Sequence, residues 1–135
     1  MKRLLRFAGV FNISAGICMI LFYHEGYRML GVEKPELTLE IQVIGILVAL
    51  FGVGYLRTAS RPVENRDLLL LGMLSKGISS VFALGYIASG ALPWWFAVVV
   101  FFADIVYVPP FWIIWRRLCR AARETKKLEN AAIRP

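Results

Sequence analysis

The stretch Leu71–Tyr86, LGMLSKGISSVFALGY, decides the fold class of this chain. It belongs to a mostly apolar run that is long enough to cross a membrane, which takes about 20 residues. Yet the run contains Lys76. A lone charge at the centre of a membrane helix costs about 2.5–3.5 kcal/mol on insertion scales, so such groups normally pair or line a wet cavity. The stretch therefore predicts a transmembrane helix whose lysine has a polar partner.

The composition of the whole chain agrees with a membrane protein. Hydrophobic residues make up 59% of the 135 residues, and the mean hydropathy is +0.63. An average soluble domain has roughly 45–50% apolar residues. A soluble domain of this size could not bury the surplus, because its surface is too large for its volume. We therefore expect an all-α, polytopic membrane protein with one membrane domain.

Four segments have the length and apolar composition of a membrane span. They are predicted at about Leu4–Tyr23, Leu37–Leu56, Leu68–Leu92 and Pro93–Trp115. The first is kept as a mature helix, because the run after MKRLLR ends without a small-x-small cleavage site. Residues 1–115 are thus expected to form an antiparallel four-transmembrane-helix bundle. Glycines and other small residues at helix-packing spacing, such as Gly9, Gly16, Gly45 and Gly52, favour close packing.

The basic residues indicate the direction of the spans. Three Lys or Arg lie at the N-terminus, three lie between the second and third spans, and seven follow the fourth. The opposite side has two, Arg28 and Lys34. The positive-inside rule then predicts that both termini are cytoplasmic. The net charge of +7 is explained by this distribution and by anionic membrane lipids, so we expect no nucleic-acid partner. Residues 116–135 are expected to be a basic cytoplasmic tail, helical and either solvated or lying on the membrane surface.

A candidate site follows from the depths of the polar residues within the spans. At about 1.5 Å of rise per residue, Lys76 lies roughly 12 Å and Asp104 roughly 16 Å from the cytoplasmic edge. They lie on neighbouring helices, so we expect them to pair. Asn12, at about 12 Å, belongs to the same layer. Further polar groups beside this layer are Ser79, Ser80 and Tyr107.

Two prolines, Pro109 and Pro110, follow Asp104 in the fourth span. A proline within a helix lacks the N–H that would bond four residues earlier, so the carbonyls of Ile105 and Val106 are predicted to be free beside the polar layer. The buried pair itself has two interpretations. It can be a clip that fixes which helices meet, or it can bind a ligand or a proton.

A second polar group lies outside the spans. His24, Glu25, Glu36 and Glu40 form a weak candidate for a metal site, and the simpler interpretation is a solvated acidic loop. We therefore predict no metal, and no cofactor is identified. The two cysteines, Cys18 and Cys119, are expected to be too far apart for a disulfide. The sequence has no catalytic triad order, P-loop or dinucleotide fingerprint, so an enzyme is not favoured.

The segments GVGYLRTASRPVENRDLLLLGMLSKG, GALPWW and FFADIVYVPPF carry a resemblance that covers about residues 12–115. The chain resembles small bacterial four-helix membrane proteins, and its layout is similar to that of the DoxX-like group. Gly72, Lys76 and Asp104 match a glycine and lysine in the third span and an aspartate in the fourth. The resemblance implies a bundle in the bacterial inner (plasma) membrane, associated with a redox or quinone-linked partner.

Three functions remain open from the sequence. The first is a non-enzymatic accessory or interaction subunit, acting through a membrane-complex partner or as a homo-oligomer. The second is a pocket for a small apolar or amphipathic ligand, such as a quinone or lipid, with Lys76, Asp104 and Asn12 as its polar anchors. The third is proton-coupled transport by an oligomer that uses the same pair.

Overall fold

The computed structural model describes residues 1–34 and 36–133 and contains helices but no strand within them. The elements are α1 (Lys2–Leu21), α2 (Tyr23–Leu30), α3 (Leu39–Ser60), α4 (Arg66–Ala88), α5 (Phe96–Ala103), the short 3-10 helix η1 (Ile105–Tyr107) and α6 (Val108–Ile133). Four helical stretches are long and apolar enough to cross a membrane: Lys2–Leu21, Leu39–Ser60, Arg66–Ala88 and Phe96–Leu128. The prediction of an all-helical chain with four candidate spans is confirmed.

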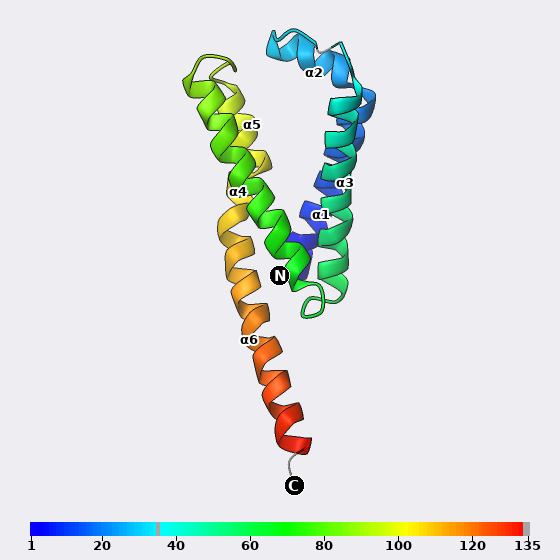
Figure 1. Cartoon of the computed structure of the whole chain (residues 1–135), viewed down its shortest axis with the longest axis vertical. Coiled ribbons are helices and arrows are strands. Elements are labelled where there is room, and N and C mark those ends of the chain that lie inside the picture. Colours follow the sequence, from blue (N-terminus) through cyan, green and yellow to red (C-terminus); the bar gives the residue numbers. More distant parts are fainter. Residues whose placement is uncertain (35, 134–135) are drawn as a thin grey trace.

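The helices are arranged as two pairs that spread apart (Figure 1). One pair is α1 with α3. The other is α4 with the fourth span, which consists of α5, η1 and α6. The pairs meet at the end where the chain begins and separate toward the opposite end. The buried core lies at the closed end, where it is formed by Leu5, Ala8, Tyr55, Ala59, Leu69, Met73, Tyr107, Phe111, Ile114 and Leu118. The spans therefore form an open arrangement, whereas the spacing of small residues led us to expect close packing throughout.

Glycines bring α1 and α3 into direct backbone contact. A Cβ atom at Gly9 would lie 2.9 Å from the carbonyl oxygen of Gly52, and one at Gly45 would lie 2.8 Å from that of Gly16. These distances leave no room for a larger side chain. Small residues let membrane helices approach in this way where no hydrophobic effect drives them together. The predicted role of these four glycines in packing is confirmed.

The turn between α3 and α4 is held by side chains at its two ends. The Thr58 hydroxyl donates to the carbonyl oxygens of Gly54 at 2.9 Å and Asn65 at 3.1 Å. The Asn65 amide donates to the Arg61 carbonyl at 3.0 Å. The Thr58 bonds link the last turns of α3 to Asn65, which directly precedes α4. The closed end of the molecule is thus fixed by hydrogen bonds as well as by the core.

Residues 24–30, expected to be part of an outer loop, belong with Tyr23 to the separate helix α2. Helix α1 ends at Leu21 because Phe22 leaves the helical conformation (φ −116°, ψ 24°). Helix α2 ends at Gly31, which is left-handed (φ 66°). The Val32 N–H there bonds to the Tyr27 carbonyl at 3.3 Å, as in a Schellman end. In Figure 1, α2 lies across the open end of the molecule.

The fourth span is interrupted at Asp104, where φ is −127° and ψ is −60°. Pro109 and Pro110 fall in the first turn of α6, where a helix N–H has no partner within the helix, so two prolines are tolerated there. The prolines therefore begin a new helix. They do not kink a continuous one.

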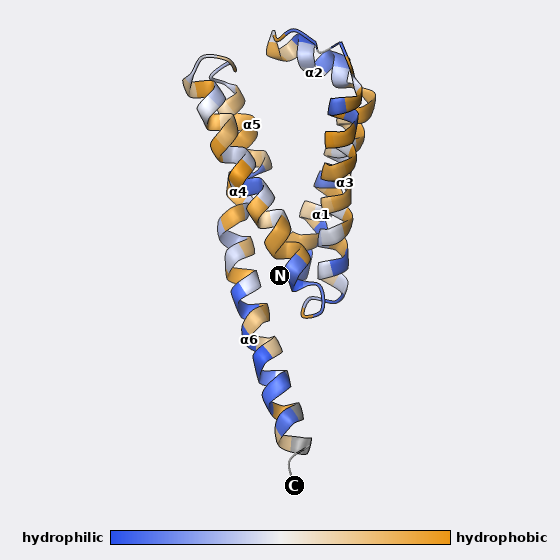
Figure 2. Cartoon of the chain, in the orientation of Figure 1, coloured by the Kyte–Doolittle hydropathy of each residue, from blue (hydrophilic) through white to orange (hydrophobic). Residues whose placement is uncertain are grey.

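Helix α6 runs without a break from the span into the basic tail. Figure 2 shows the change from apolar to hydrophilic residues along it. The tail predicted at residues 116–135 is thus helical as far as Ile133 and projects away from the spans (Figure 1).

Candidate functional site

Lys76 and Asp104 form an ion pair between α4 and the break in the fourth span. The Lys76 Nζ lies 2.7 Å from Asp104 Oδ1. The lysine side chain is 8% exposed and the aspartate side chain is 26% exposed. A charge-assisted bond of this length is among the stronger hydrogen bonds in proteins. The pairing expected from the depths of the two residues is present.

The lysine also binds a backbone carbonyl that the helix break releases. In a continuous α-helix the Tyr107 N–H would bond to the Ala103 carbonyl. Instead it bonds to the Asp104 carbonyl at 3.1 Å. The Ala103 oxygen accepts a hydrogen bond from Lys76 Nζ at 2.7 Å. The lysine therefore bonds both to one carboxylate oxygen of Asp104 and to the carbonyl at the C-terminal end of α5.

The released carbonyl is not one of the two that the prolines led us to expect. The Ile105 carbonyl accepts a hydrogen bond from the Val108 N–H, which closes η1. The break begins before the prolines, at Asp104, so the carbonyl it releases beside Lys76 is that of Ala103. The prediction that Ile105 would supply a free carbonyl is wrong, because the Val108 N–H bonds to that carbonyl.

The remaining residues of the predicted layer surround the pair in different ways. The ring of Tyr107 lies 5.3 Å from Lys76 Nζ, within the range of a cation–π contact. The Ser80 hydroxyl donates to the Lys76 backbone carbonyl at 2.7 Å, and the Ser79 hydroxyl does so at 3.2 Å. The serines therefore bind their own helix. They leave the ammonium group to Asp104, Ala103 and Tyr107.

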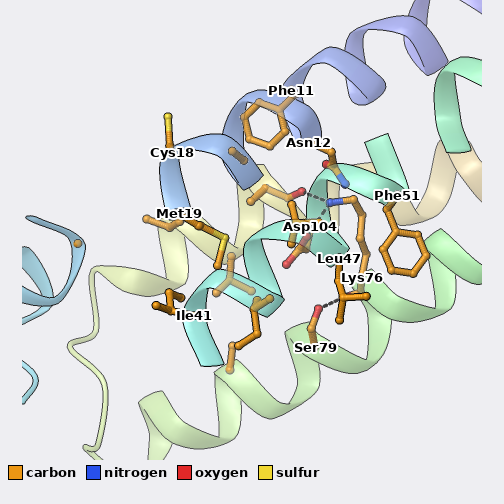
Figure 3. A pocket seen from close by; sticks show the side chains of 18 of the residues that line it. Phe11, Asn12, Cys18, Met19, Ile41, Leu47, Phe51, Lys76, Ser79 and Asp104 are labelled. Atoms are coloured by element: carbon orange, nitrogen blue, oxygen red, sulfur yellow. Dashed lines mark hydrogen bonds and ion pairs between the residues drawn. The ribbon is translucent and has the colours of Figure 1, made fainter. Parts of the chain in front are cut away.

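Asn12 reaches the same layer from α1. It is 5% exposed and lies in the lining of a pocket. Figure 3 shows its side chain pointing toward Lys76 and Asp104. Within residues 1–34 and 36–133 its amide makes no hydrogen bond. The layer therefore contains an ion pair and one amide with unused donors and an unused acceptor.

The pocket lies between the two helix pairs and has a volume of about 900 Å³. Its walls are mostly apolar and include Phe11, Met19, Ile44, Leu47, Phe51, Val99 and Val100. Lys76, Asp104 and Asn12 lie together on one side of it (Figure 3). Helix α2 contributes Tyr23, Glu25, Gly26, Tyr27, Met29 and Leu30. The cavity is therefore an apolar chamber with a small polar region inside and an amphipathic helix at its far end.

Tyr55 was not singled out from the sequence but is central to this region. It is 1% exposed and lines the pocket. Its hydroxyl is buried without a hydrogen-bond partner among the described residues. Its ring occupies the space beside Gly72, where a Cβ would lie 2.7 Å from Tyr55 Cζ. The matching glycine was the only signal in the sequence, and it does not reveal which side chain fills the space.

The external acidic residues do not gather into a metal site. Among the described residues, no group of three or more His, Cys, Asp or Glu side chains is close enough to hold a metal ion. His24 Nδ1 instead lies 3.2 Å from Lys34 Nζ. Lys34 in turn lies over the ring of Tyr23 at 4.9 Å. Glu25 lines the pocket, while Glu36 and Glu40 are exposed.

Comparisons of the chain with protein-family models, with curated proteins and with solved structures found no match. The fold and the four apolar spans define a multi-pass membrane protein. The similarity to the DoxX-like layout stays a prediction.

Proposed function

We propose that this protein is an intramembrane binder of a small amphipathic ligand. The observation that carries the proposal is the chamber of about 900 Å³ between the helix pairs, with apolar walls and a polar region that includes Lys76, Asp104 and Asn12. Ligand pockets in proteins are commonly about 300–1,000 Å³, mostly apolar, with a few polar groups that fix orientation. The chamber has all three properties.

The arrangement in the membrane that we propose is an antiparallel one, with both termini in the cytoplasm of a bacterium and the spans in its inner membrane. The clustering of Lys and Arg near the N-terminus, in the turn between α3 and α4, and along α6 supports it. The closed end of the molecule would then lie on the cytoplasmic side, and α2 would lie at the outer surface. A ligand could enter from the surrounding lipid through the gap between the pairs.

A role as an accessory subunit is the second candidate. The observation that favours it is the continuation of α6 beyond the spans as an exposed, basic helix. A projecting helix of this kind presents Arg116, Arg117 and Arg120 to the cytoplasm in the proposed orientation. This role is compatible with ligand binding, because α6 beyond Trp115 takes no part in the pocket lining.

Native mass spectrometry of the protein, extracted gently from its own membranes, tests the binding proposal. We expect a discrete added mass that is lost in Ala83→Phe, because Ala83 lines the pocket and a phenyl group would fill part of it. Ala88→Phe, five residues further along α4 at an exposed position, is the matched control and should keep the added mass. The proposal would be overturned if the wild type carried no added mass, or if Ala83→Phe carried the same added mass as the wild type.

A further inference from the structure

The hydrogen-bonding capacity of the polar region specifies the kind of head group that fits the pocket. An ammonium group has three N–H donors. In Lys76 two of them are directed to Asp104 Oδ1 and the Ala103 carbonyl, both at 2.7 Å. The Tyr107 ring, 5.3 Å from Nζ, makes a cation–π contact with the ammonium group. The lysine is therefore occupied by the protein and offers little to a ligand.

Acceptor capacity remains on the other partner of the pair. An ionised carboxylate has two acceptor oxygens. Asp104 uses Oδ1 for Lys76, while Oδ2 accepts no hydrogen bond from the residues that the structure describes. The Asp104 side chain is 26% exposed and lines the pocket. A ligand group that donates a hydrogen bond would complete this carboxylate, and the nearby Asn12 amide could bond to the same group.

The charge of the pocket disfavours an anionic head group. The charged residues that line it are Lys76, Asp104 and Glu25. Lys76 and Asp104 cancel each other at the polar region, and Glu25 adds a negative charge at the end near α2. A carboxylate or phosphate placed beside Asp104 would meet an unoccupied carboxylate oxygen with no cation left to balance it, which is costly in an apolar surrounding.

We propose that the ligand is a neutral lipid whose head group carries a hydroxyl, and that this hydroxyl donates a hydrogen bond to Asp104 Oδ2. The inference rests on the proposed binding function and names its ligand class. Long-chain alcohols, acylglycerols and quinols share this chemistry. Fatty acids and phospholipids, which present an anion, do not, and neither do oxidised quinones or ethers, which only accept.

The test uses three probes with the same sixteen-carbon tail, added to the delipidated full-length protein in detergent at pH 9. The probes are hexadecanol, hexadecyl methyl ether and palmitate. Native mass spectrometry gives the relative affinity of each. We expect hexadecanol to bind at least about tenfold more tightly than the ether, since one hydrogen bond to a charged group changes an affinity by about that factor or more. Palmitate should bind more weakly than either.

The double variant Lys76→Met/Asp104→Leu removes the acceptor and the charge together. It should still bind the tail, but hexadecanol and the ether should become equal within about twofold. If that variant does not fold, Asn12→Leu replaces it, and we expect a smaller loss of the preference for hexadecanol. Monoolein and a short-chain hydroquinone, compared in the wild type, distinguish an acylglycerol from a quinol as the source of the hydroxyl.

The outcomes separate this inference from the proposed function. Equal binding of the alcohol and the ether, or tightest binding of palmitate, would overturn the inference; the pocket itself would still be supported if Ala83→Phe abolished that binding. A preference for hexadecanol that persists unchanged in the double variant would also overturn it. Binding of none of the probes would overturn both.

Discussion

Removing the partners of the Lys76–Asp104 pair one at a time gives a direct measure of what the pair contributes to stability. The two single changes are Lys76→Met and Asp104→Val, which keep approximate size while removing charge. Breaking a buried pair typically costs about 3–5 kcal/mol, because the remaining charge is left without compensation. The structure indicates which single change should cost more.

Asp104→Val leaves the more buried charge, since the Lys76 side chain is 8% exposed and would keep only the Ala103 carbonyl and the Tyr107 ring as partners. We expect a loss near the upper end, about 5 kcal/mol. Lys76→Met leaves Asp104, which is 26% exposed and can be hydrated from the pocket. We expect a smaller loss, about 3 kcal/mol.

The double variant should be far more stable than the sum of the single changes predicts. It leaves no unpaired charge, and its remaining defect is the Ala103 carbonyl, which loses its Lys76 donor. An unsatisfied buried carbonyl costs about 1–3 kcal/mol, so the recovery should be large but incomplete. The free energy of unfolding in mixed detergent micelles measures all three variants.

The exposed Lys34 provides the matched control. Because it contacts His24 and the Tyr23 ring at the surface, Lys34→Met should change stability by less than about 1 kcal/mol. Single variants that unfold like the wild type would refute the reasoning, because the charge would then be solvated. Losses that simply add in the double variant would refute it as well, since paired residues should be coupled.

Three further predictions concern packing and orientation. Gly16→Ala should lower the stability by about 1–3 kcal/mol, because its Cβ would overlap the Gly45 carbonyl, while Gly77→Ala, with open space around it, should be neutral or stabilising in the same unfolding assay. Tyr55→Phe should leave the stability unchanged or raise it by about 1 kcal/mol, because the hydroxyl it removes has no partner among the described residues; a loss above about 1 kcal/mol would mean that the hydroxyl is bonded in the membrane. Reporter fusions at the C-terminus should be active only as cytoplasmic reporters, and an external signal would overturn the proposed orientation.

The sequence predicts the ion pair because helix geometry is regular. A rise of about 1.5 Å per residue places Lys76 and Asp104 at similar depths whatever the details of packing. The same regularity identifies the glycines that join α1 and α3. These features depend on spacing along single helices, which a sequence contains directly.

Other parts of the site depend on relations that spacing does not contain. The Ala103 carbonyl is a backbone atom, and it becomes available only because Tyr107 bonds to Asp104 instead. The chamber exists because the helix pairs diverge, which is a property of tertiary packing. Helix α2 did have a local signal, a short amphipathic run that ends at Gly31, but its position at the end of the pocket could not be derived from it.

The location of the core at one end of the molecule has a mechanical consequence. Core packing and the bonded turn hold the two helix pairs together at the closed end alone. Helix α4 has 23 residues and extends about 35 Å, so a change of about 5° in the angle between the pairs becomes a displacement of about 3 Å at its far end. If the chamber binds a ligand as proposed, the separation of the pairs at this end would depend on what the chamber holds. Two spectroscopic labels, one on each pair beside α2, would then report occupancy as a distance.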